Sequence, residues 1–265
     1  MNSHTPVVFV MIDGLRPDAI AAANCTNLQT LCERGASTLA ARSVMPSYTL
    51  PCHMSIFHSV PPTRHGITTN MFQPMARPLP GLFDYANLYN KRCSAIYNWE
   101  PLRDLGRPES LTFSWFRNSY LSEDGDDEIV AVAIDHIQRD RPDFVFVYLG
   151  TVDTYGHLFG WMSEEYLQQA HRADTLLGRL LATLPPAAHV LVHADHGGLA
   201  RNHGNDTPEE MTIPWVLSGP LVRKGYTIRG PVSLLDTAPT LARLLDCPVH
   251  PHWEGRCVEE ALLVE

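Results

Sequence analysis

The chain has 265 residues, of which 45% are hydrophobic and 18% charged, and its formal net charge is −9 at pH 7. This composition is ordinary for a globular enzyme, and the acidic balance argues against a protein that coats nucleic acid, which needs a basic surface. No segment approaches the roughly 18–20 consecutive apolar residues of a membrane span. We therefore expect neither a nucleic-acid polymer nor a membrane as partner, and the oligomeric state stays open.

The N-terminal segment does not resemble a secretory signal peptide. Pro6 is followed at once by the apolar residues 7–12, a run that is too short for a signal sequence and has no basic residues before it. The six cysteines include no Cys-x-x-Cys pair. We expect a cytoplasmic protein with reduced thiols.

Strands and helices alternate in the predicted order of elements. Residues 7–12 are continuously apolar, as in a strand buried on both faces of a parallel sheet. A helix is expected over 17–34, with Pro17 in its first turn. The further expected elements are strands at 36–44, 93–97, 144–149, 189–193 and 213–217, and helices at about 51–58, 82–89, 125–139, 163–184 and 235–245. Residues 101–120 are expected to be irregular.

This alternation predicts an α/β fold in which a mostly parallel central sheet is sandwiched between helices. The sequence has no internal repeat and no linker rich in glycine or serine. We expect one domain over residues 1–265, with a small aromatic-rich insert near 97–120.

Three of the predicted strands are each followed by an aspartate. Asp13 comes after the first strand, Asp153 after strand 144–149 and Asp195 after strand 189–193. Ligands of open α/β sheets bind beyond the carboxyl ends of the strands. We therefore expect the three carboxylates to meet at one edge of the sheet.

Histidines accompany two of these aspartates. His196 follows Asp195 directly and His203 comes seven residues later, while His157 lies four residues after Asp153, on the same face if this segment is helical. Carboxylate oxygen and imidazole nitrogen are ligands of zinc and similar cations. Each fragment alone could be an ordinary turn or a helix cap, but together they predict a binuclear metal site.

Thr49 is the candidate nucleophile. It precedes a short helix that has Pro51 in its first turn, and the N–H groups and dipole at a helix N-terminus favour anions. A threonine hydroxyl is a weak nucleophile that a metal ion can activate. The alternative is that Thr49 only caps the helix.

Five motifs together resemble the alkaline phosphatase superfamily, and within it the type I phosphodiesterase/nucleotide pyrophosphatase family. The resemblance covers about residues 7–250. The motifs are Asp13-Gly14, Thr49-Leu50-Pro51-Cys52-His53, Arg64-His65-Gly66-Ile67, Asp153-x-x-x-His157 and Asp195-His196-Gly197.

The resemblance implies two divalent metal ions, zinc or alternatively manganese. One ion would be held by Asp153, His157 and His203. The other would be held by Asp13, Asp195, His196 and the Thr49 oxygen. In nucleotide pyrophosphatases the third histidine of the first site comes much later in the chain, so His250 and His252 are alternatives to His203.

The implied activity is hydrolysis of phosphodiester or pyrophosphate bonds in a small phosphoric ester, through a phosphothreonine on Thr49. We expect Cys52, Asn70, Phe72 and Tyr155 to contact the substrate. Cys52 departs from the family, which commonly has an asparagine there. The alternatives are a phosphomonoesterase or phosphonate hydrolase on the same core, or a catalytically silent, metal-bound binding protein.

Two related enzyme classes fit the sequence less well. A sulfatase needs Cys-x-Pro-x-Arg, whereas the run here is Cys52-His53-Met54-Ser55-Ile56. A cofactor-independent phosphoglycerate mutase needs a large inserted domain, for which the segment 70–144 is too short.

Overall fold

Within residues 5–263, eight strands form one central sheet, in the order β4-β3-β5-β1-β6-β7-β2-β8. The computed structural model describes residues 5–263. The strands are β1 (Val7–Ile12), β2 (Ala36–Arg42), β3 (Cys93–Tyr97), β4 (Phe113–Phe116), β5 (Phe144–Leu149), β6 (His189–His193), β7 (Thr212–Ser218) and β8 (Tyr226–Thr227). The neighbours from β4 to β6 pair in parallel, and β7 runs antiparallel to both β6 and β2. The predicted α/β fold with a mostly parallel sheet is confirmed.

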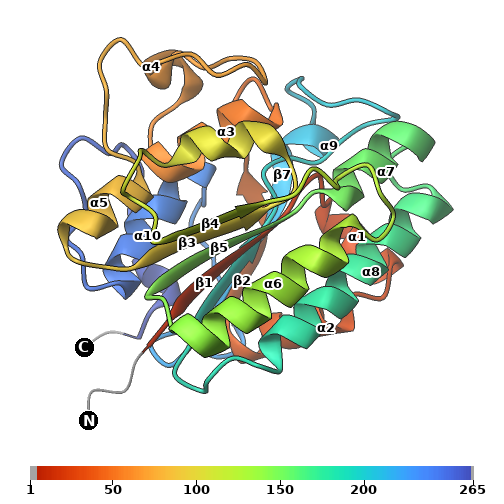
Figure 1. The fold of residues 1–265 in the computed structure, drawn as a ribbon. Helices are drawn as coiled ribbons and strands as arrows, with labels where there is room; N and C mark the ends of the chain where they lie inside the picture. The colour runs from red at the N-terminus through yellow and green to blue at the C-terminus, as the bar shows by residue number, and fades with distance from the viewer. Residues whose placement is uncertain (1–4, 264–265) are drawn as a thin grey trace.

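Helices cover both faces of this sheet. Figure 1 shows α1, α2, α6 and α8 on one face and α3, α5 and α10 on the other. The α-helices are α1 (Pro17–Ala22), α2 (Thr26–Arg34), α3 (Thr49–His58), α4 (Pro62–His65), α5 (Leu82–Leu88), α6 (Gly125–Asp140), α7 (Thr151–Phe159), α8 (Glu164–Leu181), α9 (Pro208–Met211) and α10 (Thr237–Leu244). Three 3₁₀ turns complete the fold: η1 (Glu100–Leu105), η2 (Leu234–Asp236) and η3 (Glu259–Ala261).

The apolar strands β1 and β5 lie side by side at the centre. Every residue of both is buried, because helices cover the sheet on both sides. Phe9 of β1 and Phe146 of β5 are direct partners in the register, and their ring centroids lie 5.2 Å apart. This core fixes the ends of the strands from which the predicted site residues emerge.

The expected helix over 17–34 was wrong as one element. The structure has α1 and α2 there, separated by a turn in which Asn24 adopts a left-handed conformation with φ 52°. Asparagine tolerates this conformation better than most residues. The spacing of hydrophobic residues continues across the turn, so the sequence pattern does not reveal the break between the two helices.

The segment 101–120 was expected to be irregular, and this too was wrong in part. It contains most of η1 and the edge strand β4, which pairs in parallel with β3. The side chains of β4 alternate between half-buried and exposed. An edge strand with that exposure lacks the continuous apolar pattern of β1 and β5.

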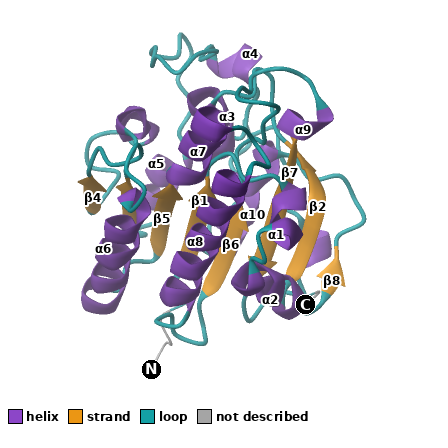
Figure 2. Ribbon diagram, turned by 90° about the vertical axis from the view of Figure 1, so that its right-hand side faces the viewer, coloured by secondary structure: helices purple, strands orange, loops and turns teal. Residues whose placement is uncertain are grey.

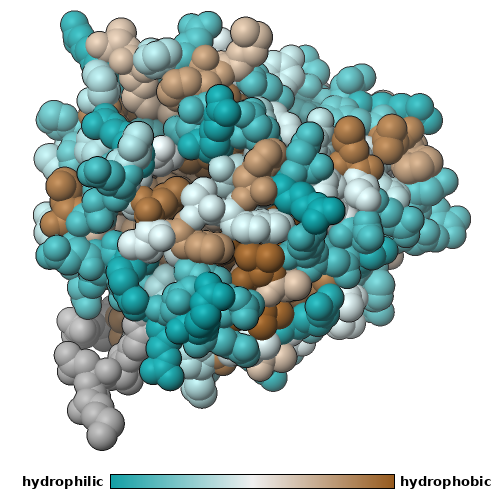
Figure 3. Space-filling view, viewed as in Figure 1, coloured by the Kyte–Doolittle hydropathy of each residue, from teal (hydrophilic) through white to brown (hydrophobic). Residues whose placement is uncertain are grey.

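Figure 2 shows α3, α4, α7 and α9 together at one end of the sheet, where the parallel strands terminate. On the face shown in Figure 3, hydrophobic side chains lie in small groups separated by hydrophilic ones. Among residues 5–263, no helix combines the length and the apolar character needed to cross a membrane.

Candidate metal centre

The three predicted aspartates lie at the same edge of the sheet. Asp13 follows β1, Asp195 follows β6 and Asp153 lies in the first turn of α7, which follows β5. Because β5, β1 and β6 are neighbours in the sheet, their carboxyl ends bring the three side chains together.

A first cluster consists of Asp13, Asp195 and His196, all buried. The Nε2 atom of His196 lies 3.3 Å from Asp13 Oδ1 and 3.4 Å from Asp195 Oδ2. The hydroxyl of Thr49, at the start of α3, lies 3.4 Å from the same Nε2 atom. Three potential ligand atoms therefore lie close together, and the candidate nucleophile lies beside one of them.

A second group lies beside the first: Asp153 and His203 share His196 with it. His157 lies next to Asp153 and His203. His203 Nε2 is 3.1 Å from His157 Nε2 and 3.6 Å from Asp153 Oδ1, and His157 Nε2 is 3.5 Å from Asp153 Oδ2. The imidazole of His203 stacks on that of His196, with centroids 3.7 Å apart. The structure thus brings all seven predicted ligand residues into one continuous group.

The alternatives to His203 lie elsewhere. His250 packs against Tyr85 of α5, with ring centroids 5.0 Å apart, and its other ring contacts are with His252 and Trp253. Of the three candidates, His203 is the one that the fold brings to Asp153.

The three clustered histidines present the same nitrogen to the centre. Each places its Nδ1 atom at hydrogen-bond distance from a backbone carbonyl, so the proton is assigned to Nδ1 and the lone pair to Nε2. The acceptors for His157, His196 and His203 are the carbonyl oxygens of Arg201, Gly197 and Ser47, at 2.8, 2.8 and 2.7 Å. The Nε2 atoms of His157 and His203 therefore face each other as two acceptors, an arrangement that a cation between them would satisfy.

The carboxylates of the site also have oxygen atoms without a hydrogen-bond partner. Asp13 Oδ1, Asp153 Oδ1 and Asp195 Oδ2 are buried without a hydrogen-bond partner. Burial raises the pKa of Asp153 and of Asp195 to about 7, and burial together with the charges of these two raises that of Asp13 well above its usual range. Orphaned oxygens and inward-facing nitrogens are the donor set that divalent cations such as zinc take, so the residues present fit such ions.

Two of the four predicted substrate contacts lie along α3. The side-chain oxygen of Asn70 accepts a hydrogen bond from the backbone N–H of Leu50 at 3.0 Å, directly beside Thr49. Cys52 is fully buried, with its sulfur 3.3 Å from the Ser43 hydroxyl, and burial raises the pKa of its thiol well above the usual range. Asn70 is thus beside the candidate nucleophile, whereas Cys52 is packed within the protein.

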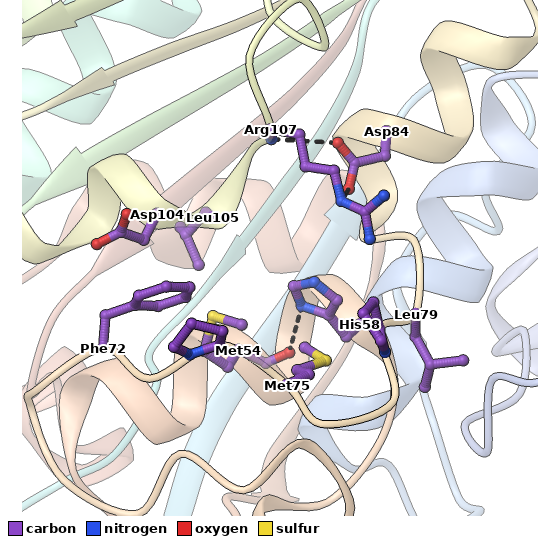
Figure 4. A pocket seen from close by; sticks show the side chains of 11 residues that line it. Met54, His58, Phe72, Met75, Leu79, Asp84, Asp104, Leu105 and Arg107 are labelled. Atoms are coloured by element: carbon purple, nitrogen blue, oxygen red, sulfur yellow. Dashed lines mark hydrogen bonds and ion pairs between the residues drawn. The ribbon is translucent and has the colours of Figure 1, made fainter.

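The other two predicted contacts do not lie among the clustered residues. Phe72 lines a separate cavity of about 330 Å³, together with Met54 and His58 of α3 and Arg107 (Figure 4). Tyr155 packs against Phe159, with ring centroids 5.3 Å apart. At about 100° per residue, a residue two positions from Asp153 projects from nearly the opposite side of α7, which is why the fold does not bring Tyr155 to the cluster.

Tyr148 and His53 contact the first cluster although the sequence did not suggest it. The hydroxyl of Tyr148 donates to Asp13 Oδ2. His53 donates from Nδ1 to the carbonyl of Thr49 at 2.7 Å, and this nitrogen lies 3.6 Å from Asp195 Oδ2. The polar tip of Tyr148 in the otherwise apolar strand β5 is a signal that could have revealed it.

Trp161 was missed as well, and it contacts three of the segments that form the site. Its indole Nε1 donates to the carbonyl of Gly14 at 2.9 Å, and its ring lies 5.0 Å from that of His157. A Cβ atom at Gly156 or at Gly198 would come within 2.6 or 2.2 Å of the indole ring. Glycine at both positions therefore admits the indole between α7 and the segment after β6.

Comparisons with known proteins agree with this architecture. The fold is shared with murine ectonucleotide pyrophosphatase/phosphodiesterase 5, whose structure was determined as an inactive form in complex with AMP: the TM-score is 0.83 at 17% identity, over 98% of this chain and 100% of that one. The protein thus belongs to the class of α/β proteins with a fold of the alkaline phosphatase type. Its carboxylates and imidazoles cluster at the carboxyl edge of the sheet.

The family model for type I phosphodiesterase/nucleotide pyrophosphatase matches residues 7–211, and the chain belongs to this family. An uncharacterized pyrophosphatase/phosphodiesterase of Schizosaccharomyces pombe is 25% identical over 217 residues, 72% of this chain and 44% of that protein. Human ectonucleotide pyrophosphatase/phosphodiesterase family member 1 is 25% identical over 219 residues, 72% of this chain and 23% of that protein. The chain therefore spans less than half the length of these two relatives. The resemblance inferred from the motifs is confirmed.

Proposed function

We propose that the protein is a two-metal hydrolase of phosphodiester or pyrophosphate bonds in small phosphoric esters such as nucleotides. The observation that carries this proposal is the position of the Thr49 hydroxyl, at the N-terminus of α3 and 3.4 Å from His196 Nε2. Family membership supports the same reaction class.

In this proposal Asp153, His157 and His203 hold one cation, and Asp13, Asp195, His196 and Thr49 hold the other. Bound divalent cations, most simply zinc, would favour the ionised Thr49 hydroxyl and neutralise charge on the phosphoryl group. Thr49 Oγ1 attacks phosphorus, one ester oxygen departs and takes up a proton, and a phosphothreonine forms. Water then cleaves the phosphothreonine and restores the hydroxyl. The side-chain NH₂ of Asn70 is available to a phosphoryl oxygen because its carbonyl oxygen is the atom bonded to Leu50.

The nucleophile is tested by Thr49→Ala. We expect this variant to keep its fold and most of its metal but to lose bis-p-nitrophenyl phosphate hydrolysis by about 10³-fold or more, roughly 4 kcal/mol in transition-state stabilisation. The matched control is Thr175→Ala, which removes a hydroxyl bonded only to the carbonyl of His171 within α8. Turnover of Thr49→Ala within tenfold of wild type would mean that water, not threonine, attacks phosphorus.

The charges near Thr49 favour a diester over a monoester. No Lys or Arg occurs between Ser43 and Thr63. Arg64 pairs with Glu254 and Arg103 with Glu100, each at 2.6 Å, so these two cations are engaged by acids. A monoester dianion needs more compensation than a diester.

We expect kcat/KM for a p-nitrophenyl diester to exceed that for the matching monoester by about tenfold, roughly 1.4 kcal/mol. Steady-state kinetics of the zinc-loaded and manganese-loaded protein with both esters measures this ratio. A preference for the monoester would contradict the charge argument and favour a phosphomonoesterase.

A further inference from the structure

Ser47 joins the segment before Thr49 to the segment that carries His203. Its backbone carbonyl accepts the hydrogen bond from His203 Nδ1 at 2.7 Å. Its hydroxyl accepts from the N–H of Gly204 at 3.1 Å and donates to the carbonyl of Asn205 at 3.3 Å. Ser47 is fully buried, and these three bonds hold it against the segment 203–205.

The bonds link the two halves of the cluster. Thr49, two residues after Ser47, contacts His196 of the first half, whereas His203 contacts Asp153 and His157 of the second. The carbonyl of Ser47 sets the direction of the His203 ring. The hydroxyl of Ser47 fixes that carbonyl relative to the backbone just after His203.

We propose that Ser47 is a positioning residue that holds His203 in register with Thr49, and that its hydroxyl sets the affinity of the cation shared by Asp153, His157 and His203. This inference rests on the proposed function for the identity of the ligand. Groups that orient metal ligands commonly change metal affinity or activity by about 10–100-fold when removed. Loss of the hydroxyl would remove the hydrogen bonds that tie Gly204 and Asn205 to Ser47, so the backbone next to His203 would be free to shift.

The chain provides a matched control at the other end of α3. Ser59 is also fully buried, and its hydroxyl donates to the carbonyl of Leu235 at 2.7 Å and accepts from the N–H of Gly255 at 3.0 Å. Ser59→Ala therefore removes the same kinds of hydrogen bond as Ser47→Ala, from a position that contacts none of the clustered residues.

The experiment is calorimetric titration of EDTA-treated protein with Zn²⁺, without any ester, for wild type, Ser47→Ala and Ser59→Ala. In Ser47→Ala we expect the Kd of one of the two cations to rise by about tenfold or more, while the other changes less than twofold. In Ser59→Ala both should stay within twofold of wild type, although thermal unfolding shifts to lower temperature in both variants. In the zinc-loaded Ser47→Ala enzyme kcat should fall more than KM rises.

Equal Zn²⁺ affinities in wild type and Ser47→Ala, or an equal loss in Ser59→Ala, would overturn the inference. If Ser47→Ala does not fold, Ser47→Cys keeps the shape of the side chain with a slightly larger atom, and it weakens both side-chain bonds because a thiol is a poor donor and acceptor. This variant should lower the affinity for one cation selectively, and unchanged affinities would overturn the inference. Since the titration contains no ester, its outcome is independent of whether the wild-type protein hydrolyses phosphodiesters, which the kinetic assay tests separately.

Discussion

His203 and its two alternatives are chemically equivalent side chains in different places. His203 presents its Nε2 atom to Asp153 and His157, whereas His250 lies against an aromatic ring of α5. The seven-residue spacing from His196 allowed one loop to return His203 to the same edge of the sheet. Sequence spacing alone could not exclude a ligand that arrives from the C-terminal segment.

The position of His203 predicts how its substitution changes the metal content of the protein. His203→Ala should lower the zinc content from about two ions to about one per chain, because loss of a ligand commonly costs a site its cation. His250→Ala is the control and should keep both ions. Elemental analysis after zinc loading and gel filtration measures the content, and loss of one zinc from His250→Ala with none from His203→Ala would reverse the assignment.

Helix α7 carries Asp153 and His157 one turn apart, and its start is held from another element. Asp126 of α6 is buried, and its carboxylate accepts from the N–H groups of Gly150 and Thr151 at 3.0 and 3.4 Å. It accepts from Asn98 as well, at 2.7 Å. These bonds satisfy N–H groups that the first turn of a helix leaves without partners.

We expect Asp126→Ala to lower the free energy of unfolding by about 2–4 kcal/mol, because buried donors to a charged group lose their acceptor. Asp127→Ala is the neighbouring control: Asp127 pairs with Arg172 at the surface, and its loss should cost about 1 kcal/mol or less. Urea unfolding of the metal-free proteins measures both values. Equal losses would show that Asp126 does not stabilise the start of α7.

The elements differ in how well sequence predicts them. β1 and β5 were correctly placed because both faces of each are covered, so their sequences are almost entirely apolar. β6 was placed from its apolar centre, which lies between two histidines. β4 was missed because an edge strand needs no such pattern, and the turn between α1 and α2 was missed because amphipathic spacing persisted through it. In α7 the four-residue spacing correctly placed His157 beside Asp153, whereas the adjacent Tyr155 projects away from them.

At the scale of the whole molecule, the buried acids make the stability of the metal-free protein depend on pH. With a pKa raised from 3.8 to about 7, Asp153 and Asp195 keep a proton in the folded chain that the unfolded chain has already lost. Stability must then fall as pH rises through this window. Burial lowers the pKa of several histidines to about 3 or 4, namely His53, His58, His65, His193 and His203. They have the opposite effect wherever the unfolded histidines bind protons, up to about pH 7.

Above about pH 7 the unfolded histidines have lost most of their protons, so the buried carboxylates determine how stability changes with pH. We expect the Tm of EDTA-treated protein to fall between about pH 7 and 8, as Asp153 and Asp195 lose their remaining protons, and then to level off. Zinc should abolish the decline, because the cations keep the carboxylates ionised in the folded chain. Thermal scans at fixed ionic strength with and without Zn²⁺ test this, and a Tm that rises with pH in EDTA would contradict it.

The clustered residues could be predicted from the sequence where chemistry and strand ends coincided. Asp13, Asp153 and Asp195 each follow a buried strand, and the parallel pairing of these strands brings the three carboxylates to one edge of the sheet. Ser47 could not be recognised in this way, because its partners are distant in sequence and serine is common, and Tyr148 gave only the weaker signal of a hydroxyl in an apolar strand. The packing of several segments shows what these two residues contact.

Trp161 changes what the glycines of the three site motifs mean. Gly156 lies between Asp153 and His157, and Gly198 follows His196 by two residues; along the chain each looks like a point of flexibility. In space both glycines contact the same indole ring, which leaves no room for a Cβ atom at either position and also donates to the carbonyl of Gly14. A distant relative that keeps the acidic and imidazole residues but has larger side chains at both glycine positions must have a smaller residue in place of the tryptophan. Two glycines packed against one large ring are thus a second sequence signature of this site, which depends on the size of the side chains rather than on their ability to bind metal.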